Sequence, residues 1–395
     1  MPGAGQFPAV EQLAEEITQW RRHFHANPEL MYEVHRTAET VADKLRHFGV
    51  DEVVTGIGRT GVVGIIKGRE TGSGRVVGLR ADMDALPIEE ATGLPYASTR
   101  KGVMHACGHD GHTAMLLGAA KHLAGTRNFD GAVALIFQPA EEGGAGSKAM
   151  IDDGLMDRFG ISEVYGLHNM PGEPLGHFSI RPGPMLAASD RFTICITGRG
   201  GHAAYPHTTI DATLVAAHVT VMLQSIVARN VDPLEAAVLS VTTVHVGDAF
   251  NVIPETAKLT GTVRTLSPAI RDLMERRISE TAEMTARALG ATAEVHYKRS
   301  YPVLINHPEQ TSFAAEVAQN VAGEAAVNRE CRPTMGAEDF AFMLQARPGA
   351  FIFAGIGEDR PRLHHPLYDF NDELIPIGCA YWIRLVEKAM PIKEG

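Results

Sequence analysis

Metal-ligating side chains are concentrated in two short stretches of this sequence. The first stretch, residues 105–112, reads His-Ala-Cys-Gly-His-Asp-Gly-His and places the thiol of Cys107 two residues from the imidazole of His109. The second stretch contains two adjacent carboxylates, Glu141 and Glu142, followed by two glycines. Sulfur, nitrogen and oxygen donors of these kinds bind zinc and similar divalent metals, which activate water for hydrolysis. The two stretches therefore predict a metal-dependent hydrolase.

The adjacent carboxylates can divide the work of hydrolysis between them. One would bind metal, and the other would take the proton from the attacking water. The pair follows Gln138-Pro139 at the end of an apolar run, where strand alternation would point the two side chains apart. Only a loop conformation can bring them together. Another acidic pair, Glu89-Glu90, is expected to be solvated.

Further donors bring the metal-ligand set to five. His168 follows a strand-like run, and His364 or His365 supplies a histidine near the carboxyl end of the sequence. Five protein donors exceed the three of a typical catalytic zinc site, so two metals sharing a bridging water are the simpler arrangement. The full set is Cys107, His109, Glu142, His168 and one of His364 and His365.

Cys107 permits a second interpretation. It lies in a loop that leads into a predicted helix, and the helix N-terminus can stabilise a thiolate there. A cysteine amidase would use Cys107 as its nucleophile with a histidine base. The number of other metal donors argues against this alternative, and an inactive scaffold that only binds small molecules is disfavoured because both the base and the ligands are present.

Composition excludes several classes of partner. The chain has 395 residues, 45% hydrophobic and 21% charged, as expected for a soluble protein of two or three domains. Its 36 basic and 47 acidic residues give a net charge of −11 without a basic cluster, which disfavours nucleic acid and anionic membranes. Widely spaced cysteines, a first segment without signal-peptide character and the lack of an apolar run of about 18 residues favour the cytoplasm.

Hydrophobic patterns predict a mostly parallel, doubly wound α/β sheet. An apolar stripe, Val10, Leu13, Ile17, Trp20 and Phe24, predicts an opening helix that ends before Asn27-Pro28. Strands are expected at residues 61–67, 75–79, 132–137 and 163–167, and a helix buried on one face at residues 112–123. Ligands bind beyond the carboxyl ends of such strands. Asp82 and Asp84, the Glu141 pair and His168 should meet at that edge.

The pattern changes after about Leu186 and predicts an inserted domain. Strand, helix, strand, strand, helix and strand are expected at residues 191–197, 209–228, 236–246, 257–265, 268–289 and 291–298. This βαββαβ order is ferredoxin-like. Catalytic-domain patterns resume after Tyr301, at residues 311–321, 338–345 and 351–355. The predicted domains are therefore residues 1–186 and 300–395 for the catalytic domain and 187–299 for the insertion.

Eight motifs along the chain resemble the M20 peptidase family, in particular its branch of hippurate hydrolases, N-acyl-amino-acid amidohydrolases and auxin-conjugate hydrolases. They begin at Arg21, Leu79, Met104, Gln138, Gly200, Phe250, Met335 and His364 and read RRHFHANPEL, LRADMDALP, MHACGHDGHT, QPAEEG, GGHAAYPH, FNVIP, MGAEDF and HHPLYDFND. The resemblance implies a dinuclear metal amidohydrolase with an inserted lid domain that dimerises.

Specific residues acquire roles from this resemblance. The metal-ligand positions are matched by Cys107, His109, Glu142, His168 and His364, and the general base by Glu141. Many members of the wider superfamily carry His-x-Asp where this chain has Asp82-Met-Asp84, so Asp82 is not assumed to bind metal, whereas Asp84 is expected to orient a ligand. The lid residue His202 would reach across the dimer to the substrate carbonyl, and Asn251 and Arg264 would hold the substrate carboxylate.

The expected reaction is hydrolysis of N-acyl amino acids to a carboxylic acid and an amino acid, with dipeptidase or carboxypeptidase activity at the same site as the alternative. The mixed donor set favours Zn, with Mn, Co or Ni also compatible. The expected assembly is a homodimer or a larger homo-oligomer built from dimers. The remaining histidines considered, His105, His112, His207, His218 and His245, are assigned structural positions.

Overall fold

Strands buried on both faces form the centre of the larger part of the molecule. The structure is a computed structural model that describes residues 12–392. Its eight-stranded sheet has the order β1-β2-β4-β3-β5-β16-β6-β15, and the four strands from β4 to β16 are parallel. The strands are β1 Glu52–Ile57, β2 Gly61–Lys67, β3 Val76–Asp82, β4 Ala132–Gln138, β5 Glu163–Met170, β6 Phe178–Ser179, β15 Val327–Asn328 and β16 Gly349–Gly355. The predicted fold class is confirmed.

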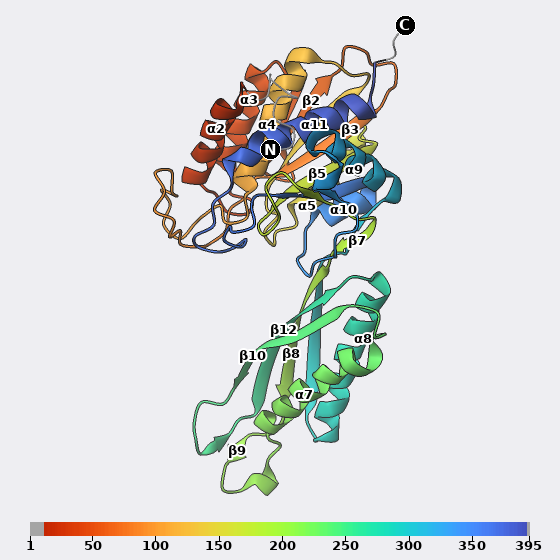
Figure 1. Ribbon diagram of the computed structural model, residues 1–395. Helices are drawn as coiled ribbons and strands as arrows, with labels where there is room; N and C mark the ends of the chain where they lie inside the picture. Colours follow the sequence, from red (N-terminus) through yellow and green to blue (C-terminus); the bar gives the residue numbers. More distant parts are fainter. Residues whose placement is uncertain (1–11, 393–395) are drawn as a thin grey trace. The chain divides into compact units, whose positions relative to one another are not determined.

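Helices cover both faces of this sheet (Figure 1). Helices α4 and α11 pack on one face and contact α2 and α9, whereas α5 and α10 contact strands β4 and β16. The helices are α2 Ala14–Ala26, α3 His35–His47, α4 His109–Thr126, α5 Gly146–Asp152, α6 Leu155–Arg158, α9 Pro308–Ala322, α10 Phe340–Ala346 and α11 Ile375–Ala389, with short 3₁₀ turns η2 Glu324–Ala326 and η3 Asp372–Leu374.

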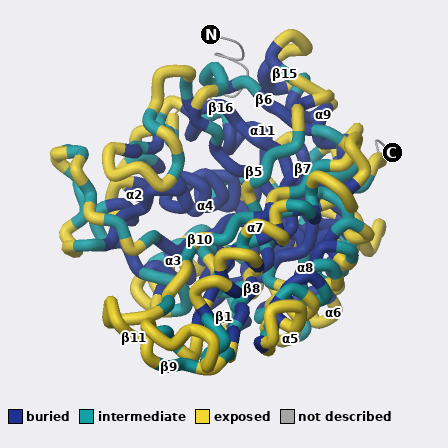
Figure 2. Tube along the Cα trace, turned by 90° about the horizontal axis from the view of Figure 1, so that it is seen from below, coloured by how far each residue is buried: buried dark blue, intermediate teal, exposed yellow. Residues whose placement is uncertain are grey.

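Helix α4 is buried on all sides, not on one face as predicted (Figure 2). The reason lies in its small residues, which allow other elements to approach closely. A Cβ at Gly118 would lie 2.7 Å from the Sγ of Cys379 in α11, and a Cβ at Gly111 would lie 2.3 Å from the ring of Phe370. The N-terminal end of α4, which carries His109, is therefore fixed between the sheet and its covering helices.

Sequence patterns located most of these elements but omitted some. The predicted opening helix corresponds to α2, which begins at Ala14 after Leu13, while Val10 lies outside the described residues. Helix α3, strand β1 and the buried helix α11 were not predicted. In α11, aromatic residues such as Trp382 are almost fully buried, because the helix packs between α4 and α9.

The chain divides into two units. The first contains the described residues up to Gly183, then Ile305–Arg332 and the residues from Asp339 onward, and the second contains Pro184–Leu304 and Pro333–Glu338. The boundaries predicted at 186 and 299 thus fall at 183 and 304. The short return segment was assigned to the catalytic domain by sequence but joins the second unit, because Thr334 exchanges backbone hydrogen bonds with Met185 and Ala187.

The inserted unit is an antiparallel sheet of order β10-β12-β8-β13 with helices α7 and α8. This order and the βαββαβ succession are those of a ferredoxin-like domain. Its elements are β8 Ala188–Thr197, α7 Ala212–Asn230, β10 Ala237–Val246, β12 Thr256–Thr265, α8 Pro268–Ala288 and β13 Thr292–Tyr301, with the ribbon β9 Gly201–His202 and β11 Val252–Ile253 and the turn η1 Pro206–Thr208. The chain passes between the units at β7 Gly183–Leu186 and β14 Leu304–Asn306, and again at both ends of the segment Pro333–Glu338.

Helix α7 has the length and apolar composition of a membrane span, and it is the one such helix within residues 12–392. Its side chains Val215, Val219 and Leu223 are buried in the core of the inserted unit, against β8 and β12. A core helix satisfies the same criteria of length and composition.

Candidate metal centre and active site

Three neighbouring parallel strands deliver polar side chains to one edge of the large sheet. Strand β3 ends at Asp82 and is followed by Asp84, β4 is followed by Glu141 and Glu142, and β5 contains His168. Strands β4 and β5 flank β3 and run parallel to it. The carboxyl ends of these strands therefore converge, as the sequence predicted.

A glycine sets the turn between the first two donors. Gly108 has φ 89°, a conformation that favours glycine, and it separates Cys107 from the first residue of α4, His109. A Cβ at this position would lie 2.1 Å from Oδ1 of Asn169 and 2.5 Å from the hydroxyl of Tyr368. Any larger residue would displace the loop, so Gly108 allows the thiol and the imidazole to lie side by side.

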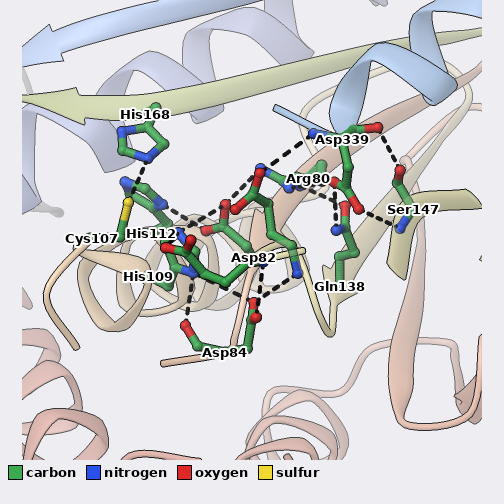
Figure 3. A network of polar contacts seen from close by, with 12 residues as sticks. Arg80, Asp82, Asp84, Cys107, His109, His112, Gln138, Ser147, His168 and Asp339 are labelled. Atoms are coloured by element: carbon green, nitrogen blue, oxygen red, sulfur yellow. Dashed lines mark hydrogen bonds and ion pairs between the residues drawn. The ribbon is translucent and has the colours of Figure 1, made fainter. Parts of the chain in front are cut away.

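The five predicted metal donors lie together in the structure. Figure 3 shows three of them, Cys107, His109 and His168. The Sγ of Cys107 is 3.4 Å from Nε2 of His168, and Nε2 of His364 is 3.3 Å from Oε1 of Glu142. The ligand atoms of Cys107, His109 and His168 lie within 4.8 Å of one another, and so do those of Cys107, Glu142 and His364. Cys107 belongs to both groups, so the two groups together could hold two neighbouring divalent ions.

Among the five metal-donor residues, Nε2 of His109 and Oε1 of Glu142 are buried and have no hydrogen bond within residues 12–392, and the contact of Oε1 with His364 is an ion pair at 3.3 Å. The other ring nitrogen of His109, Nδ1, lies 2.8 Å from the carbonyl oxygen of Asp84. This contact favours the tautomer in which Nδ1 donates and the Nε2 lone pair faces the cluster. Buried polar atoms rarely remain unpaired, and here they belong to residues whose types match a divalent metal. The side chains therefore fit the metals that the donor set implies.

Electrostatics at the site also favour a cation. Burial by itself would lower the pKa of His109, but the nearby carboxylates of Asp82, Asp84 and Glu142 raise it to about 10. For Glu142, burial would raise the pKa, but contacts with His364 and His109 lower it. The field that stabilises a proton on His109 would equally stabilise a metal ion, so metal binding and proton release are coupled.

The surroundings of the Cys107 thiol oppose its ionisation in the absence of a cation. The start of α4 can stabilise a thiolate, but burial raises the pKa of Cys107 well above its usual range, and Glu142 and Glu141 raise it further. Two carboxylates nearby outweigh the partial positive charge of a helix end. The thiol is therefore neutral unless a cation compensates the surrounding negative charge.

The loop after β4 brings the side chains of Glu141 and Glu142 to the same side, although strand alternation would point them apart. Asp84 accepts the backbone N–H of Glu141 at Oδ1, 2.9 Å away, and that of Glu142 at Oδ2, 3.1 Å away. Ala140 before the pair has φ 54°, so the chain leaves the strand conformation at this point. As a result, both side chains place a carboxylate oxygen within 4.8 Å of a ring nitrogen of His109.

The contacts of His364 and His365 distinguish the two candidate metal ligands. His364 has φ 64°, donates its backbone N–H to the carbonyl of Ala106 and directs Nε2 to Glu142. His365 instead accepts the backbone N–H of Leu367 at Nδ1. Of the two candidates, His364 is therefore the one that joins the donor cluster.

Comparison with known proteins agrees with this geometry. The family model described as peptidase family M20/M25/M40 matches residues 78–388, a range that includes every residue of the donor cluster. The chain belongs to this family. It is 43% identical to a hippurate hydrolase of Campylobacter jejuni over 381 residues, which are 96% of this chain and 98% of the relative. It is also 40% identical to an N-acetyl-L-cysteine deacetylase of Bacillus subtilis, over 95% of this chain and 88% of the relative.

Solved M20 structures share the whole architecture. A dinuclear metal binding peptidase of the M20 family from Bacillus subtilis superposes with a TM-score of 0.84 at 33% identity, over 96% of this chain and 99% of that chain. A putative aminohydrolase from methicillin resistant Staphylococcus aureus gives a TM-score of 0.89 at 33% identity, over 96% and 98%. The chain is thus an M20 hydrolase with a catalytic unit and an inserted lid unit.

The lid residues expected to contact substrate lie at two separate places within the inserted unit. His202 pairs with Val252 in the β9–β11 ribbon, and the carbonyl of Asn251 accepts the N–H of Ala203 beside it. Both residues are exposed, and Figure 2 shows the exposed backbone around β9 and β11. Arg264 lies near the other end of β12, where it is half-buried and donates to the hydroxyl of Ser189.

A single copy of the lid does not bring Asn251 and Arg264 together. The ribbon follows the Thr197 end of β8 and precedes Thr256, whereas Arg264 lies eight residues further along β12, about 26 Å by the rise of a strand. The extended strand thus separates Asn251 from Arg264 within one lid. The prediction that both hold one carboxylate therefore requires the two side chains to come from different subunits.

Sequence reasoning also missed two buried groups beside the site. Glu90, expected to be solvated, is held by His25 and by the backbone N–H of Ser98. His25 in turn contacts Asp110, the second residue of α4, at 2.9 Å. Arg80 and Asp339 form a second group, on the far side of Asp82. For Arg80 and Asp339, the one signal in the sequence was that they lie within the LRADMDALP and MGAEDF motifs.

Proposed function

We propose that this chain hydrolyses the amide bond of N-acyl amino acids, with two divalent metals held by Cys107, His109, Glu142, His168 and His364. The observation that carries the proposal is the pair of donor clusters that share Cys107 beside a separate carboxylate, Glu141. Such a site can polarise a carbonyl and still retain a base. Relatives named hippurate hydrolase, N-acetyl-L-cysteine deacetylase and IAA-amino acid hydrolase support the substrate class.

Glu141 is the residue that moves the proton in this proposal. Metals at the site would supply Lewis acidity to the scissile carbonyl and to the attacking water. Glu141 takes one proton as the water oxygen bonds to the carbonyl carbon, and it delivers that proton to the amide nitrogen as the carbon–nitrogen bond breaks. The products are a carboxylic acid, which keeps the second proton of the water, and an amine; at neutral pH that proton is passed on, and the two leave as a carboxylate and an ammonium. Asp84 holds the backbone of Glu141, so it keeps the base in place without meeting the substrate.

The substrate's own carboxylate would be bound by Arg264. A guanidinium matches a carboxylate with two parallel hydrogen bonds and remains charged at all working pH values. On a chain of net charge −11, a local cation of this kind is needed to attract an anionic substrate. His202 would donate to the oxyanion, and Asn251 would contact the carboxylate, both from the lid of the other subunit.

We also propose a homodimer formed through the lid, because Asn251 and Arg264 can hold one carboxylate only if they come from two subunits. The inserted unit offers a surface for it. Leu214, Val221 and Met222 form an exposed apolar stripe on α7 at helical spacing, and they lie outside the buried face of that helix. Strand β10 is an edge of the sheet and exposes Val238 and Val244. A second copy of the same surface can cover the apolar helix face and pair with the free strand edge, which gives an isologous interface.

The metal and the compartment are further parts of the proposal. A site of one thiolate, three imidazoles and one carboxylate suits Zn best, and Mn, Co or Ni fit the same donors. The four cysteines are free, in keeping with a reducing cytoplasm.

Carboxypeptidase activity is the second candidate. Two thermostable carboxypeptidases of Saccharolobus solfataricus are each 40% identical to this chain, over 94% of both chains. A peptide and an N-acyl amino acid share the scissile amide and the terminal carboxylate, and differ in the group on the acyl side. A nucleophilic Cys107 is not favoured, because burial and adjacent carboxylates keep its pKa high.

A substrate panel tests the proposal directly. The protein would be stripped with a chelator, reconstituted separately with Zn, Mn, Co and Ni, and assayed with N-acetyl, N-benzoyl and aminoacyl derivatives of the same amino acids. We expect no turnover without metal and higher kcat/KM for acyl than for aminoacyl substrates. Preference for aminoacyl substrates would establish the peptidase alternative, and full activity in metal-free protein would reject both.

A further inference from the structure

Arg80 lies at the centre of a buried hydrogen-bond network beside the donor cluster (Figure 3). It is the fifth residue of β3, and its side chain is fully buried. All three of its guanidinium nitrogens are used. Nε donates to Oε1 of Gln138 at 2.8 Å, Nη1 donates to Oδ2 of Asp82 at 2.7 Å, and Nη2 donates to Oδ1 of Asp339 at 3.2 Å.

One arm of this network leads to the metal donors. Asp82, held by Arg80, contacts Nδ1 of His112 through Oδ1 at 2.6 Å. The ring of His112 packs edge-on against the ring of His168, with centroids 4.6 Å apart. The other oxygen of Asp82 is 3.6 Å from Nε2 of His109, the ring nitrogen that faces the cluster. A shift of Asp82 would therefore change the surroundings of two metal donors.

The other arm leads to the base. Asp339, held by Arg80, accepts Nε2 of Gln138 at 2.8 Å and the backbone N–H of Ser147 at 3.0 Å. Its own backbone N–H lies 3.4 Å from Oε1 of Glu141 and donates to it. The position of Asp339 thus helps to orient one oxygen of the base.

We propose that Arg80 is a positioning residue that ties the metal-donor side of the site, through Asp82, to the base side, through Asp339. The planar guanidinium fixes the directions of its bonds, so the two carboxylates are held at a set separation. A lysine would keep the charge but has no planar fork with which to hold Gln138, Asp82 and Asp339 in one plane. The inference rests on the proposed function for the role of Glu141, but not for the metal donors.

The two arms make different predictions. Asp82→Asn removes an acceptor next to His112 and His109, and loss of such an outer contact weakens metal binding about 10–100-fold. Asp339→Asn disturbs the base instead, and a displacement of about 1 Å costs on the order of 100-fold in kcat. We expect Asp339→Asn to leave metal affinity within about threefold of wild type, by contrast with Asp82→Asn, and Arg80→Lys to lower both quantities.

The experiment measures metal affinity of the stripped full-length chain by competition with a chelator, the absorption spectrum of the Co-loaded protein, and kcat and KM for an N-acyl amino acid. Arg75→Lys is the matched control. Arg75 immediately precedes the same strand, pairs with Glu163 at the opposite end from the metal donors and should change none of these quantities. A folded Arg80→Lys protein with metal affinity and kcat both within about threefold of wild type would overturn the inference.

If Arg80→Lys fails to fold, a double-mutant cycle that leaves Arg80 unchanged tests the same inference. Because Asn and Asp have the same shape, Asp82→Asn, Asp339→Asn and the double variant form a cycle around Arg80. Coupling through Arg80 predicts that Asp82→Asn also lowers kcat at saturating metal and that this loss and the loss in Asp339→Asn are not additive in the double variant; additive losses would refute it. If the wild-type chain binds metal but hydrolyses no substrate, the proposed function fails, while the metal affinities of Asp82→Asn and of the folded Arg80 variant still decide this inference.

Discussion

Replacing the base tests the mechanism most directly. In Glu141→Gln the backbone N–H bonded to Asp84 is unchanged, and the amide oxygen of glutamine can still accept the N–H of Asp339. The substituted side chain should therefore stay in place and lose only its ability to take a proton. Because Glu142 and the other donors are untouched, metal content should also stay unchanged.

The expected loss follows from the contribution of a positioned general base, roughly 10²–10⁴-fold in kcat. This factor corresponds to about 3–5.5 kcal/mol of activation free energy. The assay is steady-state hydrolysis of an N-acyl amino acid, with metal per chain measured on the same samples. KM should change far less than kcat, since Glu141 acts on the water and not on the substrate.

Glu142→Gln is the matched control. It makes the same chemical change at the adjacent residue, but Glu142, unlike Glu141, lies with the metal donors His364 and Cys107. This variant should lose metal affinity, and added metal should restore part of its activity, whereas metal should not restore Glu141→Gln. A metal-replete Glu141→Gln protein with kcat within tenfold of wild type would refute the role of Glu141 as the base, because another group would then have to accept the proton.

Three other predictions concern the lid and the pH dependence of stability. Mixing His202→Ala with Glu141→Gln subunits should recover up to about a quarter of wild-type activity, because half of the dimers would be hybrids with one intact site each; no recovery in verified hybrids would exclude supply of His202 by the partner. Arg264→Ala should lower kcat/KM about 10–100-fold for an N-acyl amino acid but little for the corresponding amide, and equal losses would assign Arg264 a structural role. Burial alone would lower the pKa of His25, but hydrogen bonds with Asp110 and Glu90 raise it to about 9. Protonated His25 therefore stabilises the fold fully below its unfolded pKa, about 6.5, and about 3 kcal/mol of unfolding free energy is lost as pH rises to about 9. Denaturant titrations of wild type and His25→Gln across this range measure it, and parallel pH profiles would contradict it.

Several elements were predictable because their signals are local. Continuous apolar runs such as those of β4 and β16 indicate strands buried on both faces, and the βαββαβ succession of the lid is visible as a change in period. Helix α4 was located correctly, but its burial on all sides was not predicted. The period of its apolar residues shows one face, whereas Gly111 and Gly118 permit contacts on the others.

The candidate site was predictable in its membership but not in its geometry. The spacing of Cys107 and His109 is short enough to be read from the sequence. That Glu142 accepts a contact from His364 and not from His365 depends on a turn in which His364 has positive φ and His365 bonds to Leu367. Sequence alone left the two histidines equivalent.

The sequence by itself determined which side chains are available for chemistry, because thiol, imidazole and carboxylate groups keep their chemical character wherever the chain places them. Tertiary structure decided how those groups act. It placed three strand ends at one edge, turned Glu141 and Glu142 toward His109, and raised the pKa of Cys107 by burying it among carboxylates. It also separated Asn251 from Arg264 along β12. Distances and burial arise from contacts between segments far apart in the chain, and electrostatic interactions depend on both, so no local pattern could supply them.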